Sequence, residues 1–199
     1  MSRIVRTISK DAAVVCSAID GTDIVAEIEK IHGTSAVVTA ALGRLALGTS
    51  LIGFGLKDKD DSVSVRINGG GPVGNMVAVS DSFGNVKAYC DEPIVEIPLK
   101  PNGKLDVSGA VGKEGNLFVT KNLGMKEPYN GFVPITSGEI AEDITAYYAI
   151  SEQIPTVCAL GVLVNPDLSV NCSGGYIIQL LPGADNKTID TLEDNDKKM

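Results

Sequence analysis

Residues 35–56 read SAVVTAALGRLALGTSLIGFGL and decide which kind of fold this chain can adopt. The segment is apolar nearly all round, and from Ala36 to Leu56 its only charged residue is Arg44. A helix of this composition is buried on every side, inside a protein or in a bilayer. An arginine in the middle of a membrane span costs about 2.5–3.5 kcal/mol on insertion scales, and the flanking sequence is typical of a soluble fold. We therefore predict a buried central helix that is capped by Ser35, extends to about Leu56, and lets other elements approach its alanines and glycines closely.

The sequence before this helix predicts two strands and a short amphipathic helix. Residues 3–19 alternate loosely between apolar and polar side chains and form two strand segments. Residues 22–31 form the helix, which ends at His32-Gly33 because glycine is favoured just past a helix end. The apolar stripe of this helix has the spacing i, i+4, i+7 and comprises Ile24, Ile28 and Ile31.

Residues 62–120 carry mostly strand and turn patterns. Residues 62–67 alternate strictly between polar and apolar, and residues 76–79 and 86–90 flank a turn in the manner of a hairpin. The strands expected in this region are 62–67, 76–79, 86–90, a short edge strand at 94–97 between two prolines, 107–111 and 117–120.

A third helix is expected to open at Thr136, where Thr136 and Glu139 have the spacing of a capping box. Glu142 and Asp143 add negative charge to its first turns, which suits the helix dipole, and Pro155 stops it. First-turn carboxylates are usually dipole partners rather than general acids or bases. The apolar stripe of this helix comprises Ile140, Ile144, Tyr147 and Tyr148.

Residues 157–164 and 170–181 predict a closing hairpin. If Val164 pairs with Ser169, Cys158 opposes Gly175, and Cys158 and Cys172 lie on opposite faces of the sheet, which argues against a disulfide between them. The elements together predict an α+β fold, in which a mixed or antiparallel sheet core packs against helices that include the long apolar central helix. We expect residues 1–183 to form one domain and residues 184–199 to be a polar tail.

The charge balance and the cysteine spacing exclude several classes of function. Seventeen Lys and Arg against 25 Asp and Glu give a net charge of −8, which argues against nucleic-acid binding. The cysteines are far apart, with no C-x-x-C, and there is a single histidine, so a zinc site in this chain is not expected. No apolar run of signal-peptide length follows the N-terminus, so we expect a cytoplasmic protein with four free, mostly buried thiols. These are Cys16, Cys90, Cys158 and Cys172.

Two motifs resemble catalytic or cofactor-binding sites and are better explained by structure. Residues 69–74, GGGPVG, match the dinucleotide fingerprint G-x-G-x-x-G, but a strand pattern follows them where the fingerprint requires a helix. A tight turn between strands fits better. His32, at a helix end, has no cysteine at a spacing that makes a Cys–His nucleophile pair. No catalytic, cofactor-binding or metal site is therefore predicted, and a binding role is favoured over an enzyme.

A series of short motifs, in order along essentially the whole chain, is similar to one known family. The motifs are HGTS (32–35), TAALGR (39–44), RINGGGPVG (66–74), GKLDV (103–107), LGMKEPY (123–129), SGEIAED (137–143), SEQIP (151–155) and GGYIIQLLPGA (174–184). Together they resemble the amino-terminal domain of the heat shock protein 33 family, the redox-regulated holdase chaperones of bacteria.

The resemblance implies an ATP-independent holdase that binds unfolding proteins, and a core that dimerises with elements exchanged between subunits. It also implies a carboxy-terminal domain that holds zinc on four cysteines and unfolds on oxidation, because metal-binding free energy becomes folding free energy. The cysteines of this chain do not have that spacing, so we expect the chain to be the core without the zinc redox switch. Neither a membrane nor nucleic acid is expected as a partner.

Two interpretations of this core remain. It is a holdase by itself, or it is a dimerisation module whose client binding requires the linker that follows the core in the family. The central helix 35–56 and the sheet of residues 62–120 are both candidates for the client-binding surface, because core and binding surface share one composition.

Overall fold

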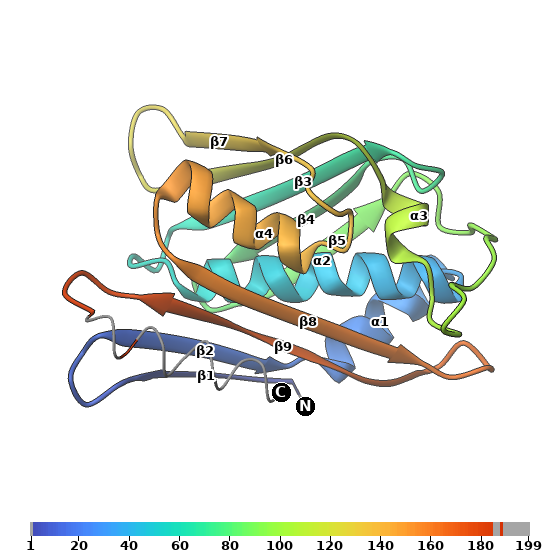
Figure 1. The fold of residues 1–199 in the computed structure, drawn as a ribbon, viewed down its shortest axis with the longest axis horizontal. Coiled ribbons are helices and arrows are strands. Elements are labelled where there is room, and N and C mark those ends of the chain that lie inside the picture. Colours follow the sequence, from blue (N-terminus) through green and yellow to red (C-terminus); the bar gives the residue numbers. More distant parts are fainter. Residues whose placement is uncertain (1, 185–187, 189–199) are drawn as a thin grey trace.

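The computed structural model describes residues 2–184 and 188, which form two antiparallel sheets with helices between them (Figure 1). The four-stranded sheet has the order β1-β2-β9-β8, and the five-stranded sheet has the order β5-β4-β3-β6-β7. The strands are β1 (Arg3–Ile8), β2 (Val14–Asp20), β3 (Ser62–Gly70), β4 (Met76–Asp81), β5 (Val86–Cys90), β6 (Gly112–Asn122), β7 (Tyr129–Pro134), β8 (Thr156–Val164) and β9 (Val170–Leu180). The helices are α1 (Thr22–His32), α2 (Ala36–Phe54), α3 (Val107–Val111) and α4 (Ala141–Tyr147), which continues as a π-helical turn over Tyr148–Glu152. The predicted α+β class is confirmed, whereas the tail expected at 184–199 lies, except for two residues, outside the described part of the chain.

Helix α2 is the predicted central helix. It is long and apolar enough to cross a bilayer, but 89% of its most apolar window is buried inside the fold, as in the core helix of a soluble protein. Ser35 occupies the N-cap position without making a side-chain capping bond. Its hydroxyl donates instead to the carbonyl oxygen of Val95 at 2.9 Å and accepts the Val95 N–H at 3.1 Å. Ser35 therefore anchors the segment after β5 to the start of α2.

Glycines in α2 let neighbouring elements reach its backbone, as predicted. A methyl group on Gly43 would lie 2.7 Å from Val25 Cγ1 of α1 and 3.0 Å from Val162 Cγ2 of β8. A methyl group on Gly53 would lie 2.5 Å from the carbonyl oxygen of Asp81 at the end of β4. Distances below 3.0 Å are too short for a real carbon contact, so Gly43 and Gly53 must lack a side chain for their neighbours to pack this closely on the helix.

Three predictions for the shorter elements are wrong. Residues 107–111 form a helical turn rather than a strand, because the Asp106 carboxylate accepts the Gly109 N–H at 3.0 Å and caps the turn. Residues 94–97 form no strand, because Val95 spends its N–H and carbonyl on Ser35 rather than on a neighbouring strand. Ile31 is 65% exposed, and the buried face of α1 comprises Val25 and Ile28.

The capping box predicted for Thr136 and Glu139 does not form, and α4 begins later, at Ala141. The buried carboxylate of Asp143 takes the role of the cap. It accepts N–H groups from Thr136 at 2.7 Å, Ser137 at 3.0 Å, Gly138 at 3.4 Å and Ile140 at 2.9 Å. These bonds fold residues 136–140 into a loop that precedes the helix, and they leave Glu139 free to face α2. The predicted apolar stripe of this helix is buried, as expected.

The hairpin of β8 and β9 forms with a different register. Val164 pairs with Val170, and a bulge between Leu163 and Val164 shifts the ladder, so Cys158 lies opposite Ile177 rather than Gly175. A shift of two residues keeps each side chain on its predicted face. Cys158 is buried and Cys172 is exposed, so the placement of the two thiols on opposite faces is confirmed.

Candidate functional site

The strand registers define a largely apolar surface on the outer face of the four-stranded sheet. Alternate residues point toward the helices and are buried, among them Val15, Ile19 and Ile177. Figure 1 shows α2 and α4 lying between the two sheets, so the helices cover the inner face of each. None of the described helices or strands packs on the outer face. The residues that point outward in register are Val5, Thr7, Val14, Cys16, Ala18, Tyr176, Ile178, Leu180, Val157, Ala159 and Leu163.

This outer face is almost free of charge. Its charged residues are Arg3 and Asp20, which lie opposite each other at one end of the β1–β2 pair. Val5, Val157 and Leu163 are exposed, the last at 54%, and most of the other outward residues are half-buried by their neighbours. A sheet face with exposed aliphatic side chains and little charge has the composition of a surface that binds apolar segments of other proteins.

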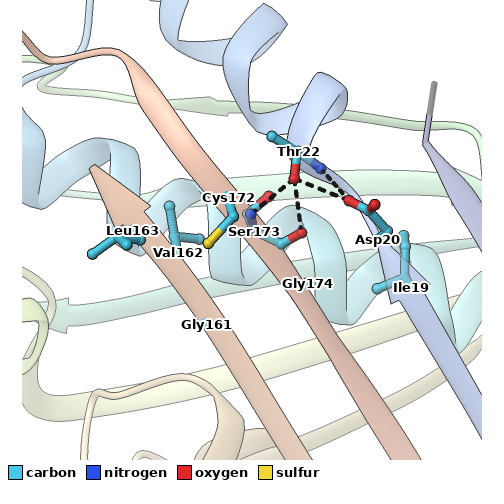
Figure 2. Close-up of a pocket in the computed structure, with 9 residues that line it drawn as sticks. All are labelled: Ile19, Asp20, Thr22, Gly161, Val162, Leu163, Cys172, Ser173 and Gly174. Carbon is cyan, nitrogen blue, oxygen red and sulfur yellow. Dashed lines mark hydrogen bonds between the residues drawn. The ribbon is translucent and has the colours of Figure 1, made fainter. Parts of the chain in front are cut away.

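A shallow hollow lies at the end of the sheet where two glycines face each other (Figure 2). Gly161 of β8 and Gly174 of β9 are paired, and a methyl group on Gly161 would meet no atom within 4 Å. Leu163 and Cys172 form an apolar wall. The missing side chain of Gly161 therefore leaves room on the sheet for a side chain of a bound segment.

Polar groups at the rim of this hollow are already engaged within the fold. Thr22 Oγ1 donates to Asp20 Oδ1 at 2.9 Å and accepts the Ser173 N–H at 3.0 Å (Figure 2). The Thr22 N–H also donates to Asp20, and these hydrogen bonds lower the pKa of the Asp20 carboxyl. The Asp20 carboxylate at the rim is therefore already hydrogen-bonded within the fold and is not a reactive group.

The four cysteines do not fit a zinc site. Cys158 is on the inner face of the four-stranded sheet, Cys16 and Cys172 are on its outer face, and Cys90 ends a strand of the other sheet. Across residues 2–184 and 188, no group of three or more His, Cys, Asp or Glu side chains could hold a metal ion. Cys158 is the only fully buried thiol of the four, so the expectation that most are buried is wrong.

Burial also makes three of these thiols poor metal ligands or nucleophiles, because only the thiolate reacts. Burial raises the pKa of Cys16. Burial, together with the nearby carboxylates of Asp91 and Glu92, raises the pKa of Cys90 to about 11. Burial alone raises the pKa of Cys158 to about 12. Each of these groups is protonated at neutral pH.

The glycine-rich residues 69–74 comprise the last two residues of β3 and most of the turn from β3 to β4, so the predicted turn between strands is confirmed. The N–H of Gly71 donates to the carbonyl oxygen of Val111 at 3.0 Å, and that of Val73 donates to Ala110 at 3.1 Å. Because these donors are spent on the α3–β6 junction, the turn has no cradle of free N–H groups for a phosphate. His32 is also engaged structurally, with its Nε2 3.0 Å from the carbonyl oxygen of Ala88 in β5.

The sequence left two candidates for the client-binding surface, the central helix 35–56 and the sheet of residues 62–120. The helix is buried and cannot present a surface, which removes the first candidate. The outer face of the four-stranded sheet was missed, because its strands come from both ends of the chain. The alternation of Val14, Cys16 and Ala18 with buried Val15, Ser17 and Ile19 was the available signal, but it does not say which strands are neighbours.

Comparison of the sequence and of the fold with known proteins gives matches to one protein family. The family model described as Hsp33 protein matches residues 2–199. Proteins named 33 kDa chaperonin are 51% identical over 88% of this chain in Clostridioides difficile and 48% identical over 96% of it in Acetivibrio thermocellus. The chain spans 60% and 64% of those two relatives. A crystal structure of the 33 kDa chaperonin from Thermotoga maritima superposes with a TM-score of 0.93 at 37% identity, covering 98% of this chain and 67% of that one.

Proposed function

The chain belongs to the heat shock protein 33 family, and from that premise we propose that it is a holdase chaperone that binds unfolding proteins on the outer face of its four-stranded sheet. The observation that carries the proposal is the open, nearly uncharged face with exposed Val5, Val157 and Leu163. A holdase binds the unfolded state through apolar surface and needs no catalytic geometry. Its relatives are named as chaperonins of bacteria, which supports a chaperone of the bacterial cytoplasm.

We propose that this activity requires neither ATP nor an oxidant. The N–H groups of the glycine-rich turn donate to backbone carbonyls of the same chain, so they are not available to bind a nucleotide phosphate. The described cysteines are dispersed and mostly protonated, so oxidation has no paired thiolates to act on within this part of the molecule. We propose that redox control through zinc is not built from these four thiols.

We infer that residues 1–183 form one folding unit. A single cluster of buried side chains runs from Ile19 of β2 through α2 to Ile177 of β9 and includes the inner faces of both sheets. Splitting the chain at any loop between β2 and β9 would divide this cluster. Limited proteolysis should therefore leave the residues from β2 to β9 as one intact fragment.

We further propose that the chain forms a dimer in which β1 is the element that is exchanged. Apart from its antiparallel pairing with β2, β1 packs little against the other helices and strands, and nearly all of its residues are exposed. An edge strand with few other contacts can be replaced by its counterpart from a second copy. Sedimentation should show a dimer, and deletion of residues 1–9 should convert it to a monomer; an unchanged dimer would rule out exchange of β1.

The holdase proposal is tested by light scattering of a client protein that aggregates on heating. The purified chain, without ATP or oxidant, should suppress the scattering at a few-fold molar excess. The variant Val5→Thr/Val157→Thr/Leu163→Thr should bind client about tenfold more weakly, because polar groups replace exposed aliphatic side chains. Threonine is β-branched, a shape that a strand favours.

A matched control replaces three apolar side chains of similar exposure elsewhere on the molecule. These are Ile31 on α1 and Ile94 and Leu99 in the loop after β5. Ile31→Thr/Ile94→Thr/Leu99→Thr should suppress scattering as well as the unchanged chain does. If the control loses activity to the same extent, binding is not specific to the four-stranded sheet. If the unchanged chain never suppresses scattering, the chain is an assembly module rather than a holdase.

A further inference from the structure

The outer face of the five-stranded sheet carries one row of side chains unlike the rest of the surface. The registers align Phe132 of β7, Phe118 of β6, Arg66 of β3, Val77 of β4 and Tyr89 of β5 in a single line across all five strands. Alternate residues of the same strands point inward and are buried. None of the described helices or strands covers the outward row, because α2, α3 and α4 contact this sheet from its inner side or its end.

The row is ordered by ring contacts. The rings of Phe118 and Phe132 stack with centroids 5.9 Å apart and an interplanar angle of 30°. The guanidinium carbon of Arg66 lies 4.5 Å from the centroid of Phe118. Phe132 is 64% exposed and Tyr89 is 49% exposed, so large aromatic area faces solvent at both ends of the row. Aromatic residues and arginine together are the composition of protein-binding hot spots.

Arg66 is the charged residue of the row itself. Arg66 is exposed and forms no ion pair within the part of the chain that the structure describes, and Lys87 lies one row away beside Val79. Two carboxylates lie beyond the row on this face, Asp81 at the end of β4 and Asp91 two residues after Tyr89, and both already accept hydrogen bonds from neighbouring residues. An arginine over a ring, with no hydrogen bond or ion pair to its guanidinium among the described residues, can bind a carboxylate with two hydrogen bonds.

We propose that this aromatic row binds an extended segment of another protein that carries carboxylates between two apolar side chains. The carboxylate would pair with Arg66, and the apolar side chains would pack on Phe132 and on Tyr89. Neighbouring strands are about 4.8 Å apart, so the row is about 19 Å long, and an extended chain of about seven residues spans it. The proposal does not depend on holdase activity, because this face lies on the opposite side of the molecule from the four-stranded sheet.

Two other occupants fit the row less well. A second copy placed face to face would bring Arg66 and Lys87 close to their own counterparts, and like charges at an interface are unfavourable. A single-stranded nucleic acid would stack bases on open rings. Here Arg66 covers one face of Phe118, Phe132 stacks on the same ring, and the chain has a net charge of −8.

The test is fluorescence anisotropy with a labelled peptide of about seven residues that has leucine at both ends, two glutamates at inner positions and serine elsewhere. The peptide should bind the chain saturably, and the version with glutamine in place of glutamate should bind at least about fivefold more weakly. Arg66→Gln should weaken binding of the glutamate peptide by a similar factor and abolish the preference for glutamate. Arg66→Lys should restore part of it, because lysine keeps the charge but not the planar pair of donors.

Matched controls separate this face from the rest of the molecule. Lys57→Gln, which removes an exposed charge after α2, and Ile31→Thr, on α1, should leave peptide affinity unchanged. Thermal melting should show that Arg66→Gln is folded. The proposal is overturned if the peptide does not bind, if glutamine binds as well as glutamate, or if an oligothymidine displaces the peptide at lower concentration. Loss of a dimer in Arg66→Gln would also overturn it by assigning the face to a second copy.

Discussion

Arg44, the one charged residue of α2, donates a hydrogen bond from Nη1 to the Glu139 carboxylate at 2.6 Å. Lys100 binds the other oxygen of the same carboxylate, and Asp106 lies 3.7 Å from the Lys100 ammonium group. This cluster is partly buried and ties α2 to the loops that precede α3 and α4. The charge that made a membrane span unfavourable is therefore the group that fastens those loops to the central helix.

Removing the Glu139 charge should destabilise the fold. Glu139→Gln leaves the two cations facing each other, so the free energy of unfolding in urea should fall by about 1–2 kcal/mol at pH 7. Glu142→Gln, an exposed change nearby in the chain, should alter it by less than about 0.5 kcal/mol. Equal effects of the two changes would show that the ion pairs contribute nothing beyond surface charge.

The effect of Glu139→Gln should depend on pH. Burial raises the pKa of Glu139, but the hydrogen bonds from Lys100 and Arg44 outweigh burial and hold the pKa below its ordinary value. A carboxyl whose pKa is lower in the folded state stabilises above its unfolded pKa, and the contribution is lost as pH falls through the folded pKa. The stability difference should be complete above about pH 5 and shrink in more acidic solution. A difference that is constant down to about pH 3 would contradict this assignment.

Replacing Asp143 should be more harmful than replacing Glu139. Asp143→Asn substitutes an N–H₂ group for one of two oxygens that together accept four backbone N–H groups, so at least one buried donor loses its partner. We expect the free energy of unfolding to fall by about 2–4 kcal/mol, measured by urea denaturation. An Asp143→Asn variant as stable as the unchanged chain would mean that the loop of residues 136–140 does not rely on this carboxylate.

These two acidic residues show what a sequence pattern can and cannot predict. Thr136 and Glu139 have capping-box spacing, yet Gly138 and Ile140 adopt positive φ angles of 73° and 74°, so no helix runs through residues 137–140. Asp143 caps this loop in place of Thr136, but the sequence indicated Asp143 only as an acidic residue in the first turns of the helix. Local spacing could not decide between them, because the outcome depends on the partners of Glu139 on α2 and the loop before α3.

The same limit applies to the sheets and to the binding surfaces. The strand patterns of β3, β4 and β5 predicted their hairpins correctly, because neighbouring strands are also neighbours in sequence. The pairing of β2 with β9 joins residues about 160 positions apart in the chain, and no local pattern indicates it. Both open faces depend on such pairings, which is why composition alone could not locate a surface.

A methyl group at Gly53 should disrupt the contact between α2 and β4. Alanine normally stabilises a helix relative to glycine by about 1 kcal/mol, but here the added carbon would lie 2.5 Å from the Asp81 carbonyl oxygen. We expect Gly53→Ala to lower the free energy of unfolding by about 1–3 kcal/mol. Gly55→Ala, just past the helix at φ −79°, is the matched control and should be neutral or slightly stabilising. If both changes stabilise, the close approach at Gly53 is not needed.

The cysteines should differ in reactivity according to their burial. Brief pulses of iodoacetamide at pH 7.5, followed by mass spectrometry, should label exposed Cys172 first and buried Cys158 last. Cys16 and Cys90 should react at intermediate rates, because burial raises the pKa of each. All four should react at similar rates in urea. Fast labelling of Cys158 under native conditions would show that the inner face of the four-stranded sheet opens readily.

The most direct test of the central claim is to map where an unfolding client touches the molecule. A photo-crosslinking amino acid is placed at Val157 or Leu163 on the four-stranded sheet, or at Ile31 on α1 as the control, and the chain is irradiated with a heat-unfolded client. We predict covalent adducts from Val157 and Leu163 and few from Ile31, and native client should give none. Suppression of aggregation with no adduct from Val157 or Leu163, or with equal adducts from Ile31, would contradict client binding at this face.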